Sequence, residues 1–148
     1  SERGVVATAK HFLGDGGTND GQDQGVLHAT PEQLMALHGA GYTAALAEGV
    51  QTVMVSLHSW VDTASGQPQG KMHGNRALLT GLLKEKLGFD GVVVTDWNGI
   101  GQLPGCTASS CAAAINAGID MVMVPQEWKA FIAHTVARIT PKTDFTPF

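Results

Sequence analysis

A run of three valines between a glycine and an aspartate constrains this chain more than any other feature. Gly91 precedes the run Val92-Val93-Val94, and Thr95 and Asp96 follow it. Consecutive β-branched residues favour a strand buried on both faces, as in a parallel sheet covered by helices. In α/β folds, ligands bind at the C-terminal ends of parallel strands. Asp96 therefore has two interpretations that its position does not separate: a catalytic carboxylate, or a cap on the following turn.

Three further segments have the pattern of that strand, and helical patterns separate all four. Capping signals mark the start of two helices, since Thr30, Pro31 and Gln33 fit a capping box with proline at the first helical position, and Asn75 precedes the next helix. Alternation of short apolar strands with helices predicts an α/β fold with parallel strands. The predicted strands are 5–12, 52–56, 91–95 and 121–124, and the predicted helices are 30–49, 75–88, 110–116 and 127–138.

The sequence pattern does not decide between two architectures for this βα repeat. One is a doubly wound open sheet, and the other is half of a TIM-type (β/α)8 barrel. A complete barrel needs about 250 residues, so a chain of 148 residues supplies only four βα units, which is half of one. We assign residues 1–139 to this domain and residues 140–148, which lack periodicity, to an irregular tail. Half a barrel is expected to expose lining residues such as Val93 and Val122 to water.

Composition and charge argue against several classes of function. The formal net charge of −4 disfavours a nucleic-acid partner, because phosphates require a basic face. No apolar run reaches the roughly 18 residues of a membrane span. The two cysteines, Cys106 and Cys111, have no second Cys/His pair nearby and do not form a zinc site. These two cysteines can form a small-loop disulfide or remain two buried thiols. The Gly/Ser/Thr-rich surroundings favour the disulfide. Neither a metal nor another cofactor is expected.

Polar and aromatic side chains stand at or just after the end of each predicted strand. Because parallel strands end on the same side of a sheet, these side chains are expected to share a cleft. A carboxylate, hydrogen-bonding groups and tryptophans suit a sugar site, since indole faces stack on sugar rings, and a carboxylate can act as the nucleophile of a retaining glycosidase. A metal-dependent hydrolase is disfavoured, because neither His-x-His nor His-Glu-x-x-His occurs. The strand-end residues are Lys10, His11, His58, Trp60, Asp96, Trp97 and Glu127.

Four motifs resemble, in the same order, those of family 3 glycoside hydrolases, and the branch of β-glucosidases and exo-β-glucanases in particular. The resemblance extends from about Gly4 to Arg138, which is nearly the whole chain. Four ordered motifs at plausible spacing make it highly specific. The motifs are 9–18, which contains Lys10-His11-Phe12, then 71–75, 88–97 and 117–125.

The resemblance implies a role for each matching residue. Asp96 corresponds to the catalytic nucleophile, Trp97 lines the glucosyl subsite, and Lys10 and His11 hydrogen-bond the hydroxyls of the non-reducing sugar. His58 is a further candidate for substrate contact. The implied enzyme removes β-linked glucosyl units from the non-reducing ends of β-glucosides or β-glucan oligosaccharides, with retention of configuration and without a cofactor. An extracytoplasmic or secreted location is also implied.

The same resemblance implies that the site is completed outside this chain. The family's barrel uses an acid and an arginine from upstream strands, and its general acid/base is a glutamate on a second domain. We therefore expect a fragment whose partner is the remainder of its parent polypeptide, weakly active or inactive by itself. Within the chain, Glu127 is the least unsuitable substitute for the missing acid. The alternative is a non-catalytic half-barrel that binds sugar or only assembles with a partner.

Overall fold

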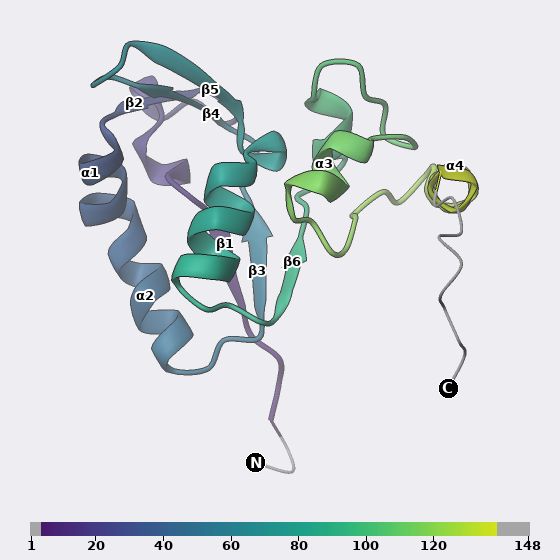
Figure 1. Ribbon diagram of the computed structural model, residues 1–148, viewed down its shortest axis with the longest axis horizontal. Helices are drawn as coiled ribbons and strands as arrows, with labels where there is room; N and C mark the ends of the chain where they lie inside the picture. The colour runs from purple at the N-terminus through teal and green to yellow at the C-terminus, as the bar shows by residue number, and fades with distance from the viewer. Residues whose placement is uncertain (1–3, 139–148) are drawn as a thin grey trace.

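The computed structural model describes residues 4–138 and has an α/β fold built on a parallel sheet (Figure 1). Strands β1 (Thr8–Phe12), β3 (Thr52–Val55) and β6 (Val92–Val94) are hydrogen-bonded in that order and run parallel. The register between β1 and β3 shifts between Ala9 and Phe12, a stretch that contains the cis peptide bond between Lys10 and His11. The predicted tail, residues 140–148, lies outside the described residues. The parallel sheet brings the C-terminal ends of β1, β3 and β6 side by side.

Helical segments follow the predicted pattern, and their starts have the predicted caps. The Thr30 hydroxyl accepts from the Gln33 amide and the Gln33 side chain accepts from the Thr30 amide, which completes the capping box. The Asn75 side chain accepts from the Leu78 amide at 3.0 Å. The segments are α1 (Pro31–Gln33), the π-helical η3 (Leu34–Gly39), α2 (Ala40–Ala47), the π-helical η5 (Ala77–Lys86), α3 (Ala112–Ala117) and α4 (Trp128–Arg138). Four short 3-10 turns are η1 (Asp15–Gly17), η2 (Asn19–Gly21), η4 (Met72–Gly74) and η6 (Gly99–Gln102).

The sheet is fully buried on one face only, and this corrects the expectation for Val93. Val53 and Val93 are 0% exposed and belong to the core cluster with leucines of η3 and η5, whereas Val92 is 37% exposed. Successive side chains of a strand point to opposite faces, so Val93 faces the helices and Val92 the less covered side. Val122 is half-buried rather than exposed. Val94, on the same side as Val92, is only 8% exposed. Burial of the run on both faces, which its composition predicted, therefore fails only at Val92.

The fourth predicted strand is reduced to one parallel bridge between Val94 and Met121. The Thr95 amide donates to the Met121 carbonyl at 3.0 Å, which continues the direction of the sheet. The Met123 amide, however, donates to the Thr95 hydroxyl at 2.8 Å. A side chain thus takes the place of a main-chain acceptor, and the ladder stops after one step. Three of the predicted strands form a sheet in the predicted order. The fourth segment lies beside this sheet and pairs with it at a single bridge.

A second sheet, absent from the sequence-based prediction, lies beyond the C-terminal ends of these strands (Figure 1). Strand β2 (Val26–Ala29) pairs in parallel with β4 (Ser59–Asp62), which pairs antiparallel with β5 (Gln67–Lys71). Trp60 of β4 is buried, and its indole N–H donates to the Ala29 carbonyl at 2.9 Å. Trp60 is therefore a core residue and not a sugar platform. Pairing between segments far apart in the chain stabilises these short strands, which the local sequence pattern did not predict.

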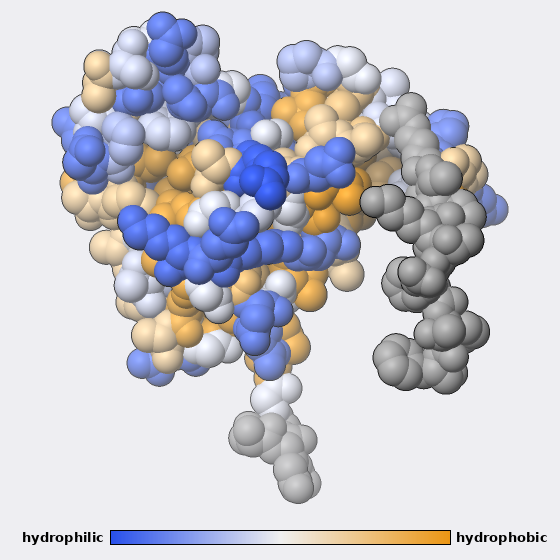
Figure 2. Space-filling view, viewed as in Figure 1, coloured by the Kyte–Doolittle hydropathy of each residue, from blue (hydrophilic) through white to orange (hydrophobic). Residues whose placement is uncertain are grey.

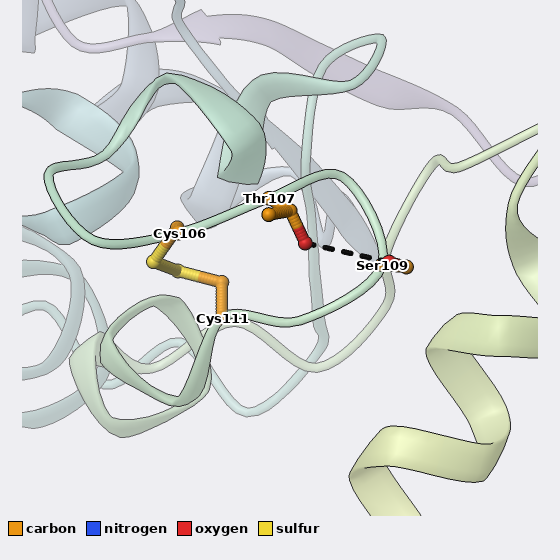
Figure 3. The surroundings of a disulfide bond; sticks show 4 residues. All are labelled: Cys106, Thr107, Ser109 and Cys111. Carbon is orange, nitrogen blue, oxygen red and sulfur yellow. Dashed lines mark hydrogen bonds between the residues drawn. A yellow bond between two sulfur atoms is a disulfide. The ribbon is translucent and has the colours of Figure 1, made fainter.

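Cys106 and Cys111 form a disulfide in the loop between η6 and α3, with a Cα–Cα distance of 4.8 Å (Figure 3). Of the two alternatives, the disulfide is the one observed. The loop also supports α4, because His134 Nδ1 lies 3.0 Å from the Ser109 carbonyl oxygen. In residues 4–138, no helix combines the length and apolar character that a membrane span requires.

The close approach of two chain segments at Gly91 gives a paired test of the fold. A Cβ at Gly91 would overlap the Gln51 carbonyl oxygen, which accepts from the Val92 amide at 3.0 Å. We expect Gly91→Ala to shift the main chain and lower the free energy of unfolding by about 1–3 kcal/mol. An added Cβ at Gly81, inside η5, meets no atom within 4 Å, so Gly81→Ala is expected to raise the free energy of unfolding by about 0.5–1 kcal/mol. Urea unfolding of both variants measures this, and effects of the same sign would contradict it.

The disulfide gives a second prediction of stability. A cross-link between residues five apart in sequence reduces the conformational entropy of the unfolded chain, which is worth roughly 2 kcal/mol for so short a loop. The double variant Cys106→Ala/Cys111→Ala is expected to lose that much stability in urea unfolding. Reduction of the unmodified protein should give the same loss, and the double variant should not respond to a reductant. An unfolding midpoint that is insensitive to both treatments would contradict the prediction.

Candidate active site

Charged and hydrogen-bonding side chains gather where β1, β3 and β6 end. His11 lies in β1, Ser56 directly follows β3, and Asp96 lies two residues after β6. The Ser56 amide donates to the Phe12 carbonyl at 2.7 Å, so the main-chain ladder extends to the site. A hollow of about 760 Å³ lies at the opposite end of the sheet between 49–51 and 87–92. We place the site at the C-terminal ends because the coupled charged groups lie there.

The geometry of the Asp96 carboxylate is compatible with both interpretations of its position, a turn cap and a catalytic carboxylate. Oδ1 has the contact expected of a turn cap, and Oδ2 is the oxygen that fits a catalytic carboxylate. Its Oδ1 accepts from the Trp97 amide at 2.6 Å, and its carbonyl accepts from the Gly99 amide at 3.1 Å, as expected of a residue that caps a turn. Its Oδ2 lies 3.4 Å from His11 Nε2, and 21% of the side chain is exposed. One oxygen thus fixes the side chain, while the other faces His11.

His11 joins two carboxylates. Its Nδ1 lies 3.1 Å from Asp15 Oδ2, and its Nε2 lies 3.4 Å from Asp96 Oδ2. A neutral imidazole donates from only one nitrogen, so the ring can donate to both carboxylates only as the imidazolium. Asp15 therefore orients the ring that faces Asp96.

Behind Asp15, a buried serine and histidine continue the network. The Ser56 hydroxyl donates to Asp15 Oδ1 at 2.8 Å and lies 2.6 Å from His58 Nδ1. His58 is 0% exposed, and its Nε2 has no hydrogen-bond partner among the described residues. The expectation that His58 contacts substrate is not met by this position. Its ring supports Ser56 from inside the protein, because both side chains are buried and hydrogen-bonded to each other.

Lys10 and Trp97 are both exposed near this end of the sheet. Trp97 is 54% exposed, immediately after Asp96, and Lys10 directly precedes His11 in β1. A hollow of about 230 Å³ adjoins Lys10, His11 and Asp15, with Tyr42 on another side. Burial, reinforced by the charge of Asp15, raises the pKa of Tyr42, so this hydroxyl stays protonated. Accessible cationic, phenolic and indole groups therefore surround the carboxylates.

Two residues of the 71–75 motif hold the main chain of the site, a role that the sequence analysis did not assign. The Lys71 ammonium donates to the Leu57 carbonyl at 2.8 Å and the Gln24 carbonyl at 3.2 Å. Burial lowers the pKa of Lys71, and the charge of Asp23 acts in the opposite direction. His73 Nε2 accepts from the Asp96 amide at 3.0 Å. The match to the 71–75 motif was the sequence signal that could have identified these two residues. Only the fold shows what their side chains contact.

Glu127 is exposed just before α4, and its carbonyl accepts from the Phe131 amide at 2.8 Å. Among the described residues, no cluster of three or more His, Cys, Asp and Glu side chains is arranged to hold a metal ion.

Comparisons with known proteins find relatives in sequence and in structure. The lysosomal beta glucosidase of Dictyostelium discoideum is 32% identical over 129 residues, which cover 82% of this chain and 15% of that protein. A beta-xylosidase of Formosa agariphila is 32% identical over 130 residues, or 83% of this chain and 17% of that protein. The crystal structure of an exo-1,3/1,4-beta-glucanase from a Pseudoalteromonas species superposes with a TM-score of 0.84 at 46% identity, over 90% of this chain and 16% of that one.

The class that the fold and these relatives define is an α/β domain of the glycosyl hydrolases. The sequence profile described as "Glycosyl hydrolase family 3 N terminal domain" matches residues 1–141. This chain belongs to glycosyl hydrolase family 3, as the four motifs implied. It spans less than a fifth of the length of each of these three relatives.

The buried His58 predicts how stability depends on pH. Burial lowers the pKa of His58 from 6.5 to about 4, although the charge of Asp15 acts in the opposite direction. Between these two pH values the unfolded chain binds more protons than the folded one. The free energy of unfolding should therefore fall as the pH is lowered from 6.5 to 4, by up to about 3 kcal/mol from this group.

A matched pair of variants isolates the contribution of His58. In His58→Asn, the shorter amide keeps a donor near Ser56 but does not titrate, so stability should change less with pH in this window. In His28→Asn, an exposed ring is replaced, and the wild-type pH dependence should remain. Urea unfolding at a series of pH values measures both, and identical profiles for the two variants would contradict the prediction.

Proposed function

We propose that this chain carries the nucleophile of a retaining glycosidase that removes β-linked glucosyl units from non-reducing ends. One observation carries the proposal: Asp96 Oδ2 lies 3.4 Å from His11 at the ends of parallel strands, on a carboxylate that is 21% exposed. The names of its relatives, a lysosomal beta glucosidase and an exo-1,3/1,4-beta-glucanase, favour glucosyl substrates. A beta-xylosidase and a beta-N-acetylglucosaminidase/beta-glucosidase among the relatives leave the sugar preference to be measured.

We further propose that the four βα units form half of a (β/α)8 barrel. Three parallel strands in chain order and a fourth parallel segment at Met121 support this. The uneven coverage of the sheet also supports it, since Val92 is 37% exposed and Met121 is 58% exposed. Figure 2 shows hydrophobic surface between the hydrophilic segments in this view. The missing half of a barrel would cover the open face and complete the site.

In the proposed reaction, Asp96 Oδ2 attacks the anomeric carbon and forms a glycosyl ester as the bond to the leaving oxygen breaks. The leaving oxygen takes a proton from an acid outside this chain, and water then releases the sugar with retained configuration. Lys10 and His11 bind sugar hydroxyls, and Trp97 stacks on the ring. His58 contributes through Ser56 and Asp15, which orient His11, and makes no contact with the sugar.

The remainder of a longer polypeptide is the proposed partner, with an upstream half-barrel and a domain that supplies the acid/base. The Cys106–Cys111 disulfide supports an oxidising, extracytoplasmic location, because such bonds persist there. The second candidate function is a non-catalytic half-barrel that binds sugar or assembles with a partner. The labelling experiment below separates the two candidates.

Covalent labelling tests the assignment of the nucleophile. The natural full-length polypeptide should form a stable ester with a 2-fluoro glucoside that carries an activated leaving group, and mass spectrometry should locate the ester at Asp96. The Asp96→Ala variant should not be labelled. Glu127→Ala is the matched carboxylate control and should be labelled at Asp96. Labelling that persists in Asp96→Ala but disappears in Glu127→Ala would overturn the assignment, and an unlabelled natural protein would favour the non-catalytic alternative.

A further inference from the structure

The His73 ring connects the ends of two strands of the main sheet. It lies in η4, outside both strands, and is 1% exposed. Its Nε2 accepts from the Asp96 amide at 3.0 Å, just beyond β6. The ring also hydrogen-bonds the main chain of Ser56, just beyond β3. One buried side chain therefore ties the main chain of the residue that carries the carboxylate to the neighbouring strand.

These partners determine the tautomer of the ring. Because Nε2 accepts from an N–H, it has no proton, and the proton of the neutral ring lies on Nδ1. Burial lowers the pKa of His73 to about 4, and the charge of Asp96 acts in the opposite direction. The ring is therefore neutral at neutral pH and remains an acceptor for the Asp96 amide.

The turn that follows Asp96 is packed against the same ring. A Cβ at Gly99 would overlap the Nε2, Cε1 and Cδ2 atoms of His73. The Gly99 amide donates to the Asp96 carbonyl at 3.1 Å, which closes the turn. Trp97 lies inside the turn, and its amide holds Asp96 Oδ1 at 2.6 Å. The ring therefore contacts both ends of the segment that presents the carboxylate and the indole.

We propose that His73 is a positioning residue that fixes the main chain of Asp96, so that its free carboxylate oxygen points at the reacting carbon. Gly99 contributes to the same positioning, because only a residue without a Cβ lets the turn lie against the ring. This inference rests on the proposed function of Asp96. It assigns His73 no contact with substrate. Substitution of His73 should therefore slow the chemical step and leave the binding of the sugar largely unchanged.

Two substitutions at His73 separate its two hydrogen bonds. The amide oxygen of glutamine reaches roughly the position of Nε2, so His73→Gln keeps an acceptor for the Asp96 amide. The amide of asparagine reaches only the position of Nδ1, so His73→Asn keeps a donor for the Ser56 main chain and loses the bond to Asp96. Both replace a buried ring by a buried amide, which makes them matched controls for packing and for stability.

The measurement is the first-order rate of labelling at saturating 2-fluoro glucoside, with the dissociation constant of glucose determined in parallel on the natural full-length polypeptide. We expect His73→Asn to lower the labelling rate about 10- to 100-fold, as a displaced nucleophile does, with glucose affinity changed less than about 3-fold. His73→Gln should recover most of the rate. Equal losses in both variants, or a rate that follows the unfolding temperature, would overturn the proposal.

Gly99→Ala tests the proposal without changing His73. It remains available if the His73→Gln and His73→Asn variants do not fold. The added methyl group should displace the turn from the ring and lower the labelling rate without weakening glucose binding. An unchanged labelling rate in Gly99→Ala would overturn the proposal. If the natural protein itself is not labelled at Asp96, the proposed function has failed, which is distinguishable from a failure confined to His73.

Discussion

The structure depends on the main-chain hydrogen bonds of β3, the central strand of the parallel sheet. β3 pairs with β1 on one side and β6 on the other, and Val53 and Val55 are buried completely against the helices. Full burial of each such side chain contributes about 1.5–3 kcal/mol. The same pairing has a chemical consequence. It brings the residues after β1, β3 and β6 within hydrogen-bonding distance, so the interaction that stabilises the sheet also assembles the site.

The site is organised in two layers of polar groups, which have different roles. Asp96, His11, Lys10 and Trp97 have accessible side chains. Ser56, His58 and His73 are buried. His73 accepts from the Asp96 amide, whereas Ser56 and His58 act through Asp15, to which the Ser56 hydroxyl donates. Buried polar groups are costly unless they are hydrogen-bonded. The hydrogen bonds that these buried groups make also fix the orientation of the groups they contact.

The sheet is also one-sided, and this links the fold to the wider family. Helices cover the face that includes Val93, whereas Val92 and Met121 stay exposed. Globular domains seldom leave the strands of a parallel sheet open on one face. The chain spans less than a fifth of the length of these relatives. The half-barrel proposed above would account for the open face.

The sequence by itself determined the α/β class, three parallel strands in order, the caps at Thr30 and Asn75, and the family. These features follow from local pattern: β-branched runs, capping residues and ordered motifs are properties of neighbouring residues. Asp96, His11 and Trp97 were predicted as site residues in the same way, and both that assignment and their roles in catalysis stay predictions.

Only the tertiary structure decided the second sheet, the burial of His58 and the contacts of Ser56 and His73. Strands β2, β4 and β5 form because segments far apart in the chain pair with each other, and no local pattern encodes such pairing. The alternation of a strand shows that Val92 and Val93 face opposite sides but not which side the helices cover. A histidine near a strand end has the same local sequence whether it faces solvent or the core. Its role is fixed by the partners that the rest of the fold brings to its two nitrogens.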